Sequence, residues 1–399
     1  MSDKTQEIIN KAEDNLFHIY NRFPVVFDHG EGVTIYDIDG KEYLDFGSGI
    51  GVMAFGYGDK EYEDALCAQV RKLIHTSNLY YHTDMAKAAE LVCEATGMDK
   101  VFFTNSGAEA IEGALKTAKK YAYKKNGKAG GEIIAMGHSF HGRTVGAVSV
   151  TGNDHYREPF YPLMDGVHFA TFNDLESVEA LVNDNTCAII TETVQGEDGI
   201  YPASKFFLEG LRKICDENGI LLIFDEIQCG MGRTGEMYAY MHYDVKPDIL
   251  TTAKALGAGV PVGAFTLTDA VADFSLEPGD HGTTYGGNPL ALAGVIASIS
   301  MMKNRKIIDH VKETTPYLES RLDELKDNHP DVIAGRRGMG FMQGLIIKED
   351  KPVGELVRTA LDNGLIVLSA EGNVLRLLPP LVIGQKEIDR MYEVLNSIL

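Results

Sequence analysis

The sequence predicts an α/β protein in which helices cover both faces of a mostly parallel sheet, with a smaller α+β part at the C-terminus. From about residue 60, short apolar runs alternate with longer stretches of helical periodicity, as in βαβ units. These runs are mostly apolar, as expected of strands that are buried on both faces of a sheet. They are residues 101–104, 132–136, 187–191, 220–224, 249–251 and 262–267.

Other elements are expected on either side of this region. Residues 33–46 alternate in polarity around Asp39-Gly40, which predicts a β-hairpin. After Pro289 we expect a long helical region that is interrupted near Asn304 and continues over residues 306–328. A glycine-rich strand at 338–345, a helix, two short strands and a C-terminal helix should follow.

These elements suggest two domains. Residues 60–285 would form a large domain and residues 286–399 a small one. The N-terminal segment, residues 1–59, would contribute to the small domain.

Composition excludes several classes of function. The formal charge is −21, from 37 basic and 58 acidic side chains, which disfavours a nucleic-acid partner because its phosphates would be repelled. The longest apolar stretch, around 289–302, is too short to cross a bilayer, so we expect no membrane partner. Five cysteines without CxxC spacing predict no metal site and a reducing, cytoplasmic location.

Asp225 and Lys254 each end one of the apolar runs, residues 219–224 and 248–253. A carboxylate at one strand end and an amine at another suit pyridoxal 5'-phosphate (PLP). The amine forms a Schiff base with the aldehyde, and the carboxylate keeps the pyridine nitrogen protonated so that the ring accepts electrons. This pair therefore predicts an enzyme that uses PLP.

The segment Thr104–Glu109 follows a predicted strand and opens a predicted helix that runs to about Lys125. Its small residues would let backbone N–H groups and the Ser106 hydroxyl approach a phosphate at the positive end of the helix. By itself the pattern fits a serine helix cap better than a phosphate site. Beside Asp225 and Lys254 it favours a phosphate site.

Two arginines have two interpretations each. Phe140 offers a ring that stacks on a pyridine, and Arg143 offers a fork for a substrate carboxylate, unless that arginine pairs with a nearby acid on the surface. Arg376 lies within an apolar strand, where a buried arginine needs a partner. That partner is either Glu197, after another predicted strand, or a second substrate carboxylate.

Two loop residues are ambiguous. The loop 281–289 contains two threonines and three glycines, and it would cap the following helix or deliver Thr284 to a phosphate, including one in a neighbouring subunit. His141 by itself does not indicate catalysis, because a packed or hydrogen-bonded loop histidine is the commoner case.

Seven segments together resemble the class III (subgroup II) aminotransferases of PLP fold type I. They are NSGAEA (105–110), SFHGRT (139–144), ETVQGE (192–197), DEIQ (225–228), AKALGAG (253–259), GTTYGGNPLA (282–291) and LRLLPP (375–380). They occur in the order typical of the family, and the similarity covers about residues 15–399. One such motif would be weak evidence, whereas seven in order are specific.

The resemblance implies a role for each site residue. Lys254 and Asp225 would be catalytic. The residues implied in cofactor binding are Ser106, Gly107, Ala108, Phe140, Asp225, Gln228, Lys254 and Thr284, the last serving the partner subunit of a homodimer. Those implied in substrate binding are Arg143, Glu197, Thr283 and Arg376. Arg376 would bind the α-carboxylate of 2-oxoglutarate and release Glu197 from a salt bridge.

The implied reaction moves the δ-amino group of N2-acetyl-L-ornithine to 2-oxoglutarate. Ile50 stands where family members acting on free ornithine resemble one another in carrying tyrosine, which favours an acylated donor. Asp198 and Thr283 replace a usual glycine and a usual serine. Succinylornithine, ornithine, 4-aminobutyrate or a lysine-pathway donor remain alternatives, as do a PLP racemase and a PLP-binding homologue without catalysis.

Overall fold

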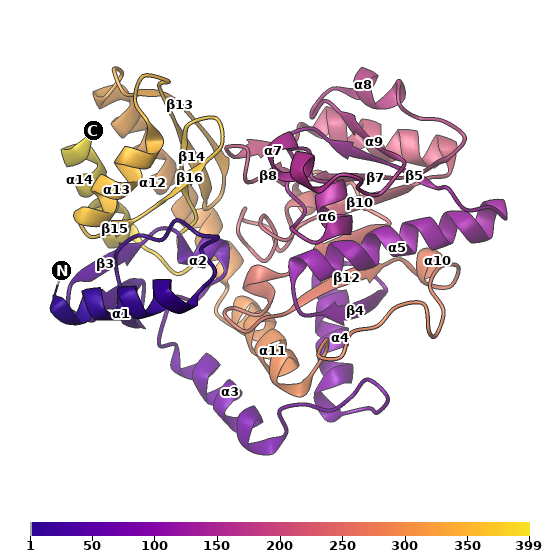
Figure 1. The fold of residues 1–399 in the computed structure, drawn as a ribbon, viewed down its shortest axis with the longest axis horizontal. Helices are drawn as coiled ribbons and strands as arrows, with labels where there is room; N and C mark the ends of the chain where they lie inside the picture. Colours follow the sequence, from indigo (N-terminus) through magenta and orange to yellow (C-terminus); the bar gives the residue numbers. More distant parts are fainter. Residues whose placement is uncertain (1) are drawn as a thin grey trace.

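The computed structural model describes residues 2–399, and its larger part is built on a seven-stranded sheet within those residues (Figure 1). In spatial order the strands are β4 (Lys100–Thr104), β12 (Gly263–Leu267), β11 (Ile249–Thr252), β10 (Leu221–Asp225), β7 (Thr186–Glu192), β5 (Glu132–Met136) and β6 (Val167–Ala170). Within this sheet β12 runs antiparallel to both of its neighbours, β11 and β4, and the other described pairs are parallel. The predicted mostly parallel α/β sheet is therefore confirmed.

Alternate residues of each central strand face opposite sides of this sheet. In β10, Leu221 and Ile223 pack in the core beneath α5 (Gly107–Asn126). Leu222 and Phe224 pack in the core that includes α9 (Lys205–Asn218) and α11 (Pro289–Asn304). Because both faces are covered, the strand is apolar at every position before Asp225.

Close packing of α5 on the sheet requires a glycine. A Cβ added at Gly113 would lie 2.1 Å from a ring carbon of Phe265 on β12. The helix therefore lies directly on the strands, and its N-terminus is held at the carboxyl edge of the parallel strands. The predicted extent of this helix, to about Lys125, agrees with its end at Asn126.

A second part of the molecule combines the C-terminal region with the N-terminal segment (Figure 1). One sheet has the order β13-β14-β17-β16, and another has the order β1-β2-β3-β15. In the latter, β3 (Glu42–Asp45) pairs in parallel with β15 (Leu365–Ile366), so the two ends of the chain share a sheet. The hairpin predicted at 33–46 is confirmed as β2 (Thr34–Asp37) and β3. The domain boundaries at 59/60 and 285/286 remain predictions.

The glycine-rich strand predicted at 338–345 is wrong, because the chain reverses within it. It forms a hairpin of β13 (Ile333–Met339) and β14 (Met342–Ile347), with Gly340 in the turn at a φ of +58°. The sequence there shows no polar break, since Phe341 in the turn is itself buried. The two short strands expected after the next helix are three, β15, β16 (Leu368–Ala370) and β17 (Val374–Leu377).

Strand β6 was also not predicted. It is four residues long, lies at the sheet edge and is only partly buried, so it lacks the long apolar run of the central strands. The break expected near Asn304 is confirmed, because α11 ends there and Lys306 adopts a φ of +52° before α12 (Ile307–Asn328) begins.

The other helices are shorter or peripheral. They are α1 (Asp3–Asn15), α2 (Ser48–Gly51), α3 (Lys60–Lys72), α4 (Thr83–Thr96), α6 (Val145–Ser149), α7 (Asp154–Arg157), α8 (Leu175–Glu179), α10 (Asp269–Ala272), α13 (Val353–Asp362) and α14 (Gln385–Ile398), with 3-10 turns η1 (Glu158–Phe160), η2 (Ala239–His242) and η3 (Lys254–Leu256). The remaining strands are β1 (Phe27–Glu31), β8 (Val194–Gln195) and β9 (Tyr201–Pro202). Across residues 2–399, no helix combines the length and the apolar character needed to cross a membrane.

Candidate active site

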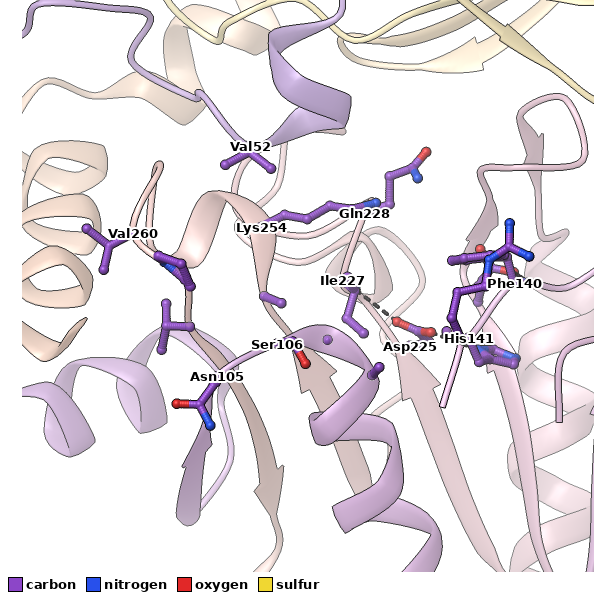
Figure 2. A pocket seen from close by; sticks show the side chains of 18 of the residues that line it. Val52, Asn105, Ser106, Phe140, His141, Asp225, Ile227, Gln228, Lys254 and Val260 are labelled. Carbon is purple, nitrogen blue, oxygen red and sulfur yellow. Dashed lines mark hydrogen bonds and ion pairs between the residues drawn. The ribbon is translucent and has the colours of Figure 1, made fainter. Parts of the chain in front are cut away.

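A cavity of about 480 Å³ opens where β7, β10 and β11 end, beside the N-terminus of α5 (Figure 2). The carboxyl edge of a parallel sheet is the usual position of a ligand site in α/β folds. Most of the predicted site residues line this cavity, namely Ser106, Gly107, Ala108, Phe140, Arg143, Asp225, Gln228 and Lys254. Glu197, Thr283, Thr284 and Arg376 are not among its lining residues.

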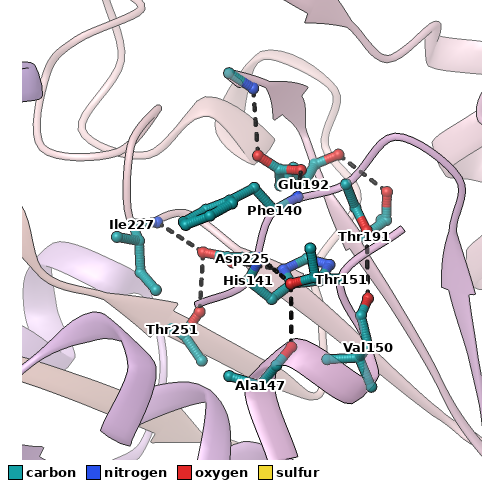
Figure 3. A network of polar contacts seen from close by, with 12 residues as sticks. Phe140, His141, Ala147, Val150, Thr151, Thr191, Glu192, Asp225, Ile227 and Thr251 are labelled. Atoms are coloured by element: carbon teal, nitrogen blue, oxygen red, sulfur yellow. Dashed lines mark hydrogen bonds and ion pairs between the residues drawn. The ribbon is translucent and has the colours of Figure 1, made fainter. Parts of the chain in front are cut away.

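Asp225 is the last residue of β10 and is held by three neighbours (Figure 3). Its Oδ2 lies 2.7 Å from Nδ1 of His141, and its Oδ1 accepts hydrogen bonds from the Ile227 N–H at 3.0 Å and the Thr251 hydroxyl at 3.3 Å. Thr251 is its partner in the register of β11. Both the Asp225 and the His141 side chains are almost fully buried. The carboxylate is therefore fixed in one orientation toward the cavity.

Glu192 faces the same region from the end of β7, where it is the register partner of Asp225. It accepts hydrogen bonds from the backbone N–H of Phe140 at 3.1 Å and of Gly196 at 3.2 Å. Burial, with the negative charge of Asp225 nearby, raises the pKa of Glu192 well above its usual value. Its carboxyl group therefore ties the segment of Phe140 to the segment that leads to Glu197.

Lys254 begins the turn η3, immediately after β11 and Ala253. Its φ of +47° is unusual for a residue with a side chain, and such strain gathers at functional sites. Burial lowers the pKa of Lys254 to about 8, although the charge of Glu197 acts in the opposite direction. The neutral amine that a nucleophile or base requires is therefore more abundant near neutral pH than for an ordinary lysine.

Glu197 and Arg376 form an ion pair at the side of the cavity. Nη1 of Arg376 lies 2.7 Å from Oε1 of Glu197, and Nε2 of Gln228 donates to the same oxygen at 3.1 Å. The Arg376 side chain is 4% exposed, whereas that of Glu197 is 28% exposed. Burial raises the pKa of Glu197, but Arg376, with smaller contributions from Lys254 and Gln228, outweighs burial, so the net pKa is lowered.

Gly196 permits this arrangement. The guanidinium of Arg376 also donates a hydrogen bond to the Gly196 carbonyl at 3.1 Å. A Cβ added at Gly196 would lie 2.2 Å from Oε1 of Gln228, so any larger residue would displace Gln228 from the pair. Although Glu197 and Arg376 do not line the cavity, Gln228 links them to it.

Arg143 lines the cavity with an exposed guanidinium that makes no ion pair with any acid in residues 2–399. Its Cζ lies 3.7 Å from the centre of the Tyr156 ring and 5.3 Å from that of Phe140. The alternative of a surface arginine paired with an acid is therefore wrong, and the group is available to a ligand.

The segment at the start of α5 supports both interpretations of its sequence. Ser106 is the N-cap, and its Oγ accepts a hydrogen bond from the Glu109 N–H at 3.3 Å. Gly107 and Ala108 are the first helical residues and line the cavity. The Glu109 N–H is thus taken by the cap, whereas the N–H groups of Gly107 and Ala108 have no acceptor within the helix and can bind an anion.

The two threonines of the 281–289 loop differ in position. The Thr283 hydroxyl accepts a hydrogen bond from Nδ2 of Asn105 at 2.8 Å, and Asn105 lines the cavity. Thr284 is exposed to solvent and lies outside the lining of its own chain's cavity. Nδ2 of Asn78 donates a hydrogen bond to the Gly286 carbonyl at 2.9 Å and so holds the loop in place.

The family model described as "Aminotransferase class-III" matches residues 18–399. This chain is a class-III aminotransferase. An acetylornithine aminotransferase of Methanocaldococcus jannaschii is 45% identical over 380 residues, which cover 95% of this chain and 94% of that protein.

Solved structures show the same architecture. The acetylornithine aminotransferase of Elizabethkingia anophelis matches with a TM-score of 0.88 and 31% identity, over 99% of this chain and 98% of its own. An ornithine aminotransferase of Toxoplasma gondii, described with partial occupancy of PLP at its active site, matches with a TM-score of 0.93 and 31% identity, over 98% and 93%. The fold of this aminotransferase is therefore PLP fold type I.

PLP is the cofactor of this class-III aminotransferase, and the residues of the cavity fit it. A partly unprotonated lysine, a fixed carboxylate and an aromatic ring line one space, and a helix N-terminus opens into it. These are the groups that an aldehyde, a pyridine nitrogen, a pyridine ring and a phosphate require. An amino donor and a keto acid are its substrates, as for other aminotransferases.

Sequence reasoning assigned no site role to several residues of this aminotransferase. Asn105, His141 and Glu192 were within the quoted motifs. Strand-end position was an available signal for Glu192, since it occupies the same place on β7 as Asp225 on β10. Val52 and the turn 259–262, which also line the cavity, carry no chemical signal in the sequence.

Proposed function

We propose that this aminotransferase transfers the δ-amino group of N2-acetyl-L-ornithine to 2-oxoglutarate, giving N-acetyl-L-glutamate 5-semialdehyde and L-glutamate. The observation that carries the proposal is the pair of arginines near one lysine: Arg143 is free, whereas Arg376 is neutralised by Glu197. A free and a masked carboxylate-binding group suit two substrates that alternate in one cavity. The M. jannaschii relative bears the name of this activity.

The cofactor residues have the roles that the resemblance implies. Gly107 and Ala108, with Ser106, would receive the phosphate, and Phe140 would stack on the ring. Asp225 would hold the proton on the pyridine nitrogen, and Gln228 would contact the ring hydroxyl. The fixed orientation of Asp225 supports its role, because a carboxylate with three donors does not rotate away from the nitrogen.

When bound, PLP supplies an aldehyde that takes up the amino group and a ring that accepts electron density. Lys254 would hold the cofactor between turnovers and, once displaced, would act through its Nζ as the general base that moves the proton of the substrate carbon. A pKa of about 8 supports this role, because a base acts best when its pKa lies near the working pH.

Substrate exchange would use the Glu197–Arg376 pair. While the donor is bound, Glu197 would neutralise Arg376, and Arg143 would hold the donor's α-carboxylate with Thr283 beside it. When 2-oxoglutarate binds, its α-carboxylate would take the place of Glu197 on Arg376. Glu197 is the more exposed partner, which supports a movement of this residue rather than of Arg376.

We further propose a homodimer in which Thr284 completes the phosphate site of the partner subunit. Its exposure, outside the lining of its own cavity, supports this assignment. The wild-type protein should scatter light as a dimer, and Thr284→Ala should weaken PLP binding while leaving the dimer intact. A fully active monomer would contradict this proposal.

The cytoplasm is the location that we propose, with no nucleic-acid or membrane partner. Within residues 2–399 the cysteines at 67, 93, 187, 215 and 229 are free thiols, which supports a reducing compartment. The charge of −21 supports small-molecule substrates over a polyanion.

A panel of amino donors with 2-oxoglutarate tests the function. The panel contains N2-acetyl-L-ornithine, N2-succinyl-L-ornithine, L-ornithine, L-lysine and 4-aminobutyrate. N2-acetyl-L-ornithine should give the highest kcat/KM of these donors, with stoichiometric loss of 2-oxoglutarate. Lys254→Ala should abolish turnover and the absorbance of covalently bound PLP. Higher kcat/KM with another donor would replace the proposed substrate, and racemisation without consumption of 2-oxoglutarate would replace the reaction class.

A further inference from the structure

Arg143 is held by aromatic rings instead of acids. Its guanidinium lies 3.7 Å from the centre of the Tyr156 ring, while the Phe140 ring is 5.3 Å away. No carboxylate within residues 2–399 forms an ion pair with it. A planar guanidinium that stacks on a ring keeps the N–H groups along its edge free, whereas an ion pair would occupy them.

Tyr156 contacts both side chains that face the ligand at this end of the cavity. Its ring meets the Phe140 ring edge-on, with centres 6.0 Å apart and an angle of 85° between the planes. Phe140 and Arg143 line the cavity, whereas Tyr156 does not. Any effect of Tyr156 on a ligand is therefore transmitted through these two residues and not by direct contact.

The position of Tyr156 is itself fixed. It lies in the one-turn helix α7, whose N-cap Asn153 accepts a hydrogen bond from the His155 N–H at 3.0 Å. The Asn153 amide in turn donates to the carboxylate of Glu371, and the Glu371 N–H donates to the Glu197 carbonyl at 2.9 Å. The ring is thus attached to the same segments that carry the Glu197–Arg376 pair.

We propose that Tyr156 is a positioning residue that holds the Arg143 guanidinium for the donor's α-carboxylate and so sets the preference for donors that carry one. Arginine has many rotamers, and ordering it costs conformational entropy when a ligand binds. Stacking on Tyr156 orders the side chain before the donor arrives. This inference rests on the proposed function, because it takes Arg143 as the group that binds the donor's carboxylate.

The aromatic face of the residue is required, and the hydroxyl is not. Within residues 2–399 the Tyr156 hydroxyl makes no hydrogen bond to the protein. Tyr156→Phe keeps the ring and both ring contacts, whereas Tyr156→Leu removes them. The two variants therefore separate stacking from any effect of the hydroxyl.

Tyr392→Leu is the matched control. It also removes a tyrosine that stacks on an arginine, since Cζ of Arg321 lies 3.6 Å from the Tyr392 ring. That pair joins α12 to α14 and takes no part in the cavity. Loss of an arginine–tyrosine stack in itself should therefore leave donor binding unchanged.

The binding test uses an unreactive probe. N2-acetyl-L-norvaline carries the α-carboxylate of the donor but lacks the δ-amine, and N-butylacetamide lacks both. By calorimetry on the PLP-loaded enzyme, Tyr156→Leu should raise the Kd of acetylnorvaline about 2- to 30-fold, from the strength of a cation–π contact. Tyr156→Phe and Tyr392→Leu should stay within about twofold, and N-butylacetamide should bind all variants alike.

Steady-state kinetics give a second readout. With N2-acetyl-L-ornithine, Tyr156→Leu should raise KM by the same factor and change kcat less, because the contact orders a binding group. An unchanged Kd and KM, an equal loss in Tyr156→Phe, or an equal loss for both probes would overturn the inference. If circular dichroism shows that Tyr156→Leu does not fold, Tyr156→Met, which also lacks the ring, takes its place.

Failure of the proposed function looks different. In that case the wild-type enzyme itself would prefer another donor in the panel. The comparison of variants then applies unchanged to that donor's carboxylate and to its decarboxylated counterpart.

Discussion

Asp225 and Glu197 are both acidic residues beside the cavity, but they are held in different ways. Asp225 is 4% exposed and has three partners, His141, Ile227 and Thr251, that belong to the sheet and its adjoining loops. Glu197 is 28% exposed, and the hydrogen bonds to its carboxylate within residues 2–399 come from the side chains of Arg376 and Gln228. The Asp225 carboxylate is therefore more tightly held than that of Glu197, which we propose exchanges its partner during turnover.

This difference matches the ligands that each carboxylate is proposed to meet. A cofactor stays through many turnovers, and a fixed charge stabilises it without reorganisation. Two substrates replace each other in every turnover, so a charge that leaves when the second substrate arrives allows one site to serve both. The comparison can be tested by changing each side in turn.

The largest effect is expected from a change at Asp225. Asp225→Ala should lower kcat by about 10²- to 10³-fold in both half-reactions, because a preorganised charge is lost that both need. Single-turnover absorbance with each substrate measures the two halves separately. Asp225→Asn should keep the contacts with Ile227 and Thr251 and serves as the matched variant of similar shape. A loss confined to one half-reaction would contradict the assignment.

A smaller effect is expected at Arg376, the partner of Glu197. Arg376→Leu should weaken the half-reaction with 2-oxoglutarate by about 10- to 100-fold, because charge-assisted hydrogen bonds to a carboxylate are lost. The half-reaction with the amino donor should change much less. Arg376→Lys keeps the charge and loses the planar fork, so it should fall in between. Equal losses in both halves would mean that Arg376 serves structure rather than substrate exchange.

Glu197→Gln should change selectivity more than rate. Arg376 would then remain unpaired with every substrate bound, so L-glutamate should gain as a donor relative to N2-acetyl-L-ornithine. We expect a shift of about 10-fold in the ratio of the two kcat/KM values, in the range set by partly buried ion pairs. Competition between the two donors in one assay measures this ratio directly. No change in the ratio would show that the ion pair does not control access to Arg376.

The smallest effect is a shift in pH dependence. Burial lowers the pKa of Lys254 to about 8, so its neutral amine should increase as pH rises through 8 and level off above it. The rate of covalent attachment of PLP to the cofactor-free protein, followed by absorbance, should have the same midpoint. An unperturbed lysine would still be gaining reactivity near pH 10.

The same measurement compares the two carboxylates. Glu197 and Asp225 both raise the pKa of Lys254, and Glu197 has the larger influence. Glu197→Gln should therefore move the midpoint further toward low pH than Asp225→Asn does. The opposite order would show that the fixed carboxylate, and not the movable one, sets the charge of the lysine.

Much of the fold followed from short-range patterns. The strands that carry Asp225 and Glu192 are continuous apolar runs, and such runs form buried parallel strands wherever helices cover both faces. The hairpin at 338–345 was missed because its turn contains a buried phenylalanine and no polar residue. Edge strand β6 was missed because partial burial removes the apolar signal.

The site was predicted unevenly for a related reason. Asp225, Lys254 and the start of α5 were recognisable because each is a chemical group at the end of a regular element. Arg143 and Arg376 kept two interpretations, since their partners lie elsewhere in the chain. For Arg376 the partner is 179 residues away, and for Arg143 it is a ring that no motif contains.

The sequence alone determined the α/β class, the order of the main elements and the residues that resemble a PLP-dependent aminotransferase. Periodicity and local motifs encode these features, because they depend on neighbours within a few turns of the chain. Only the tertiary structure decided which charges are paired, that Asp225 is more buried than Glu197, and that the Tyr156 ring lies against Arg143. Such contacts depend on how distant segments pack, and no local pattern specifies that packing.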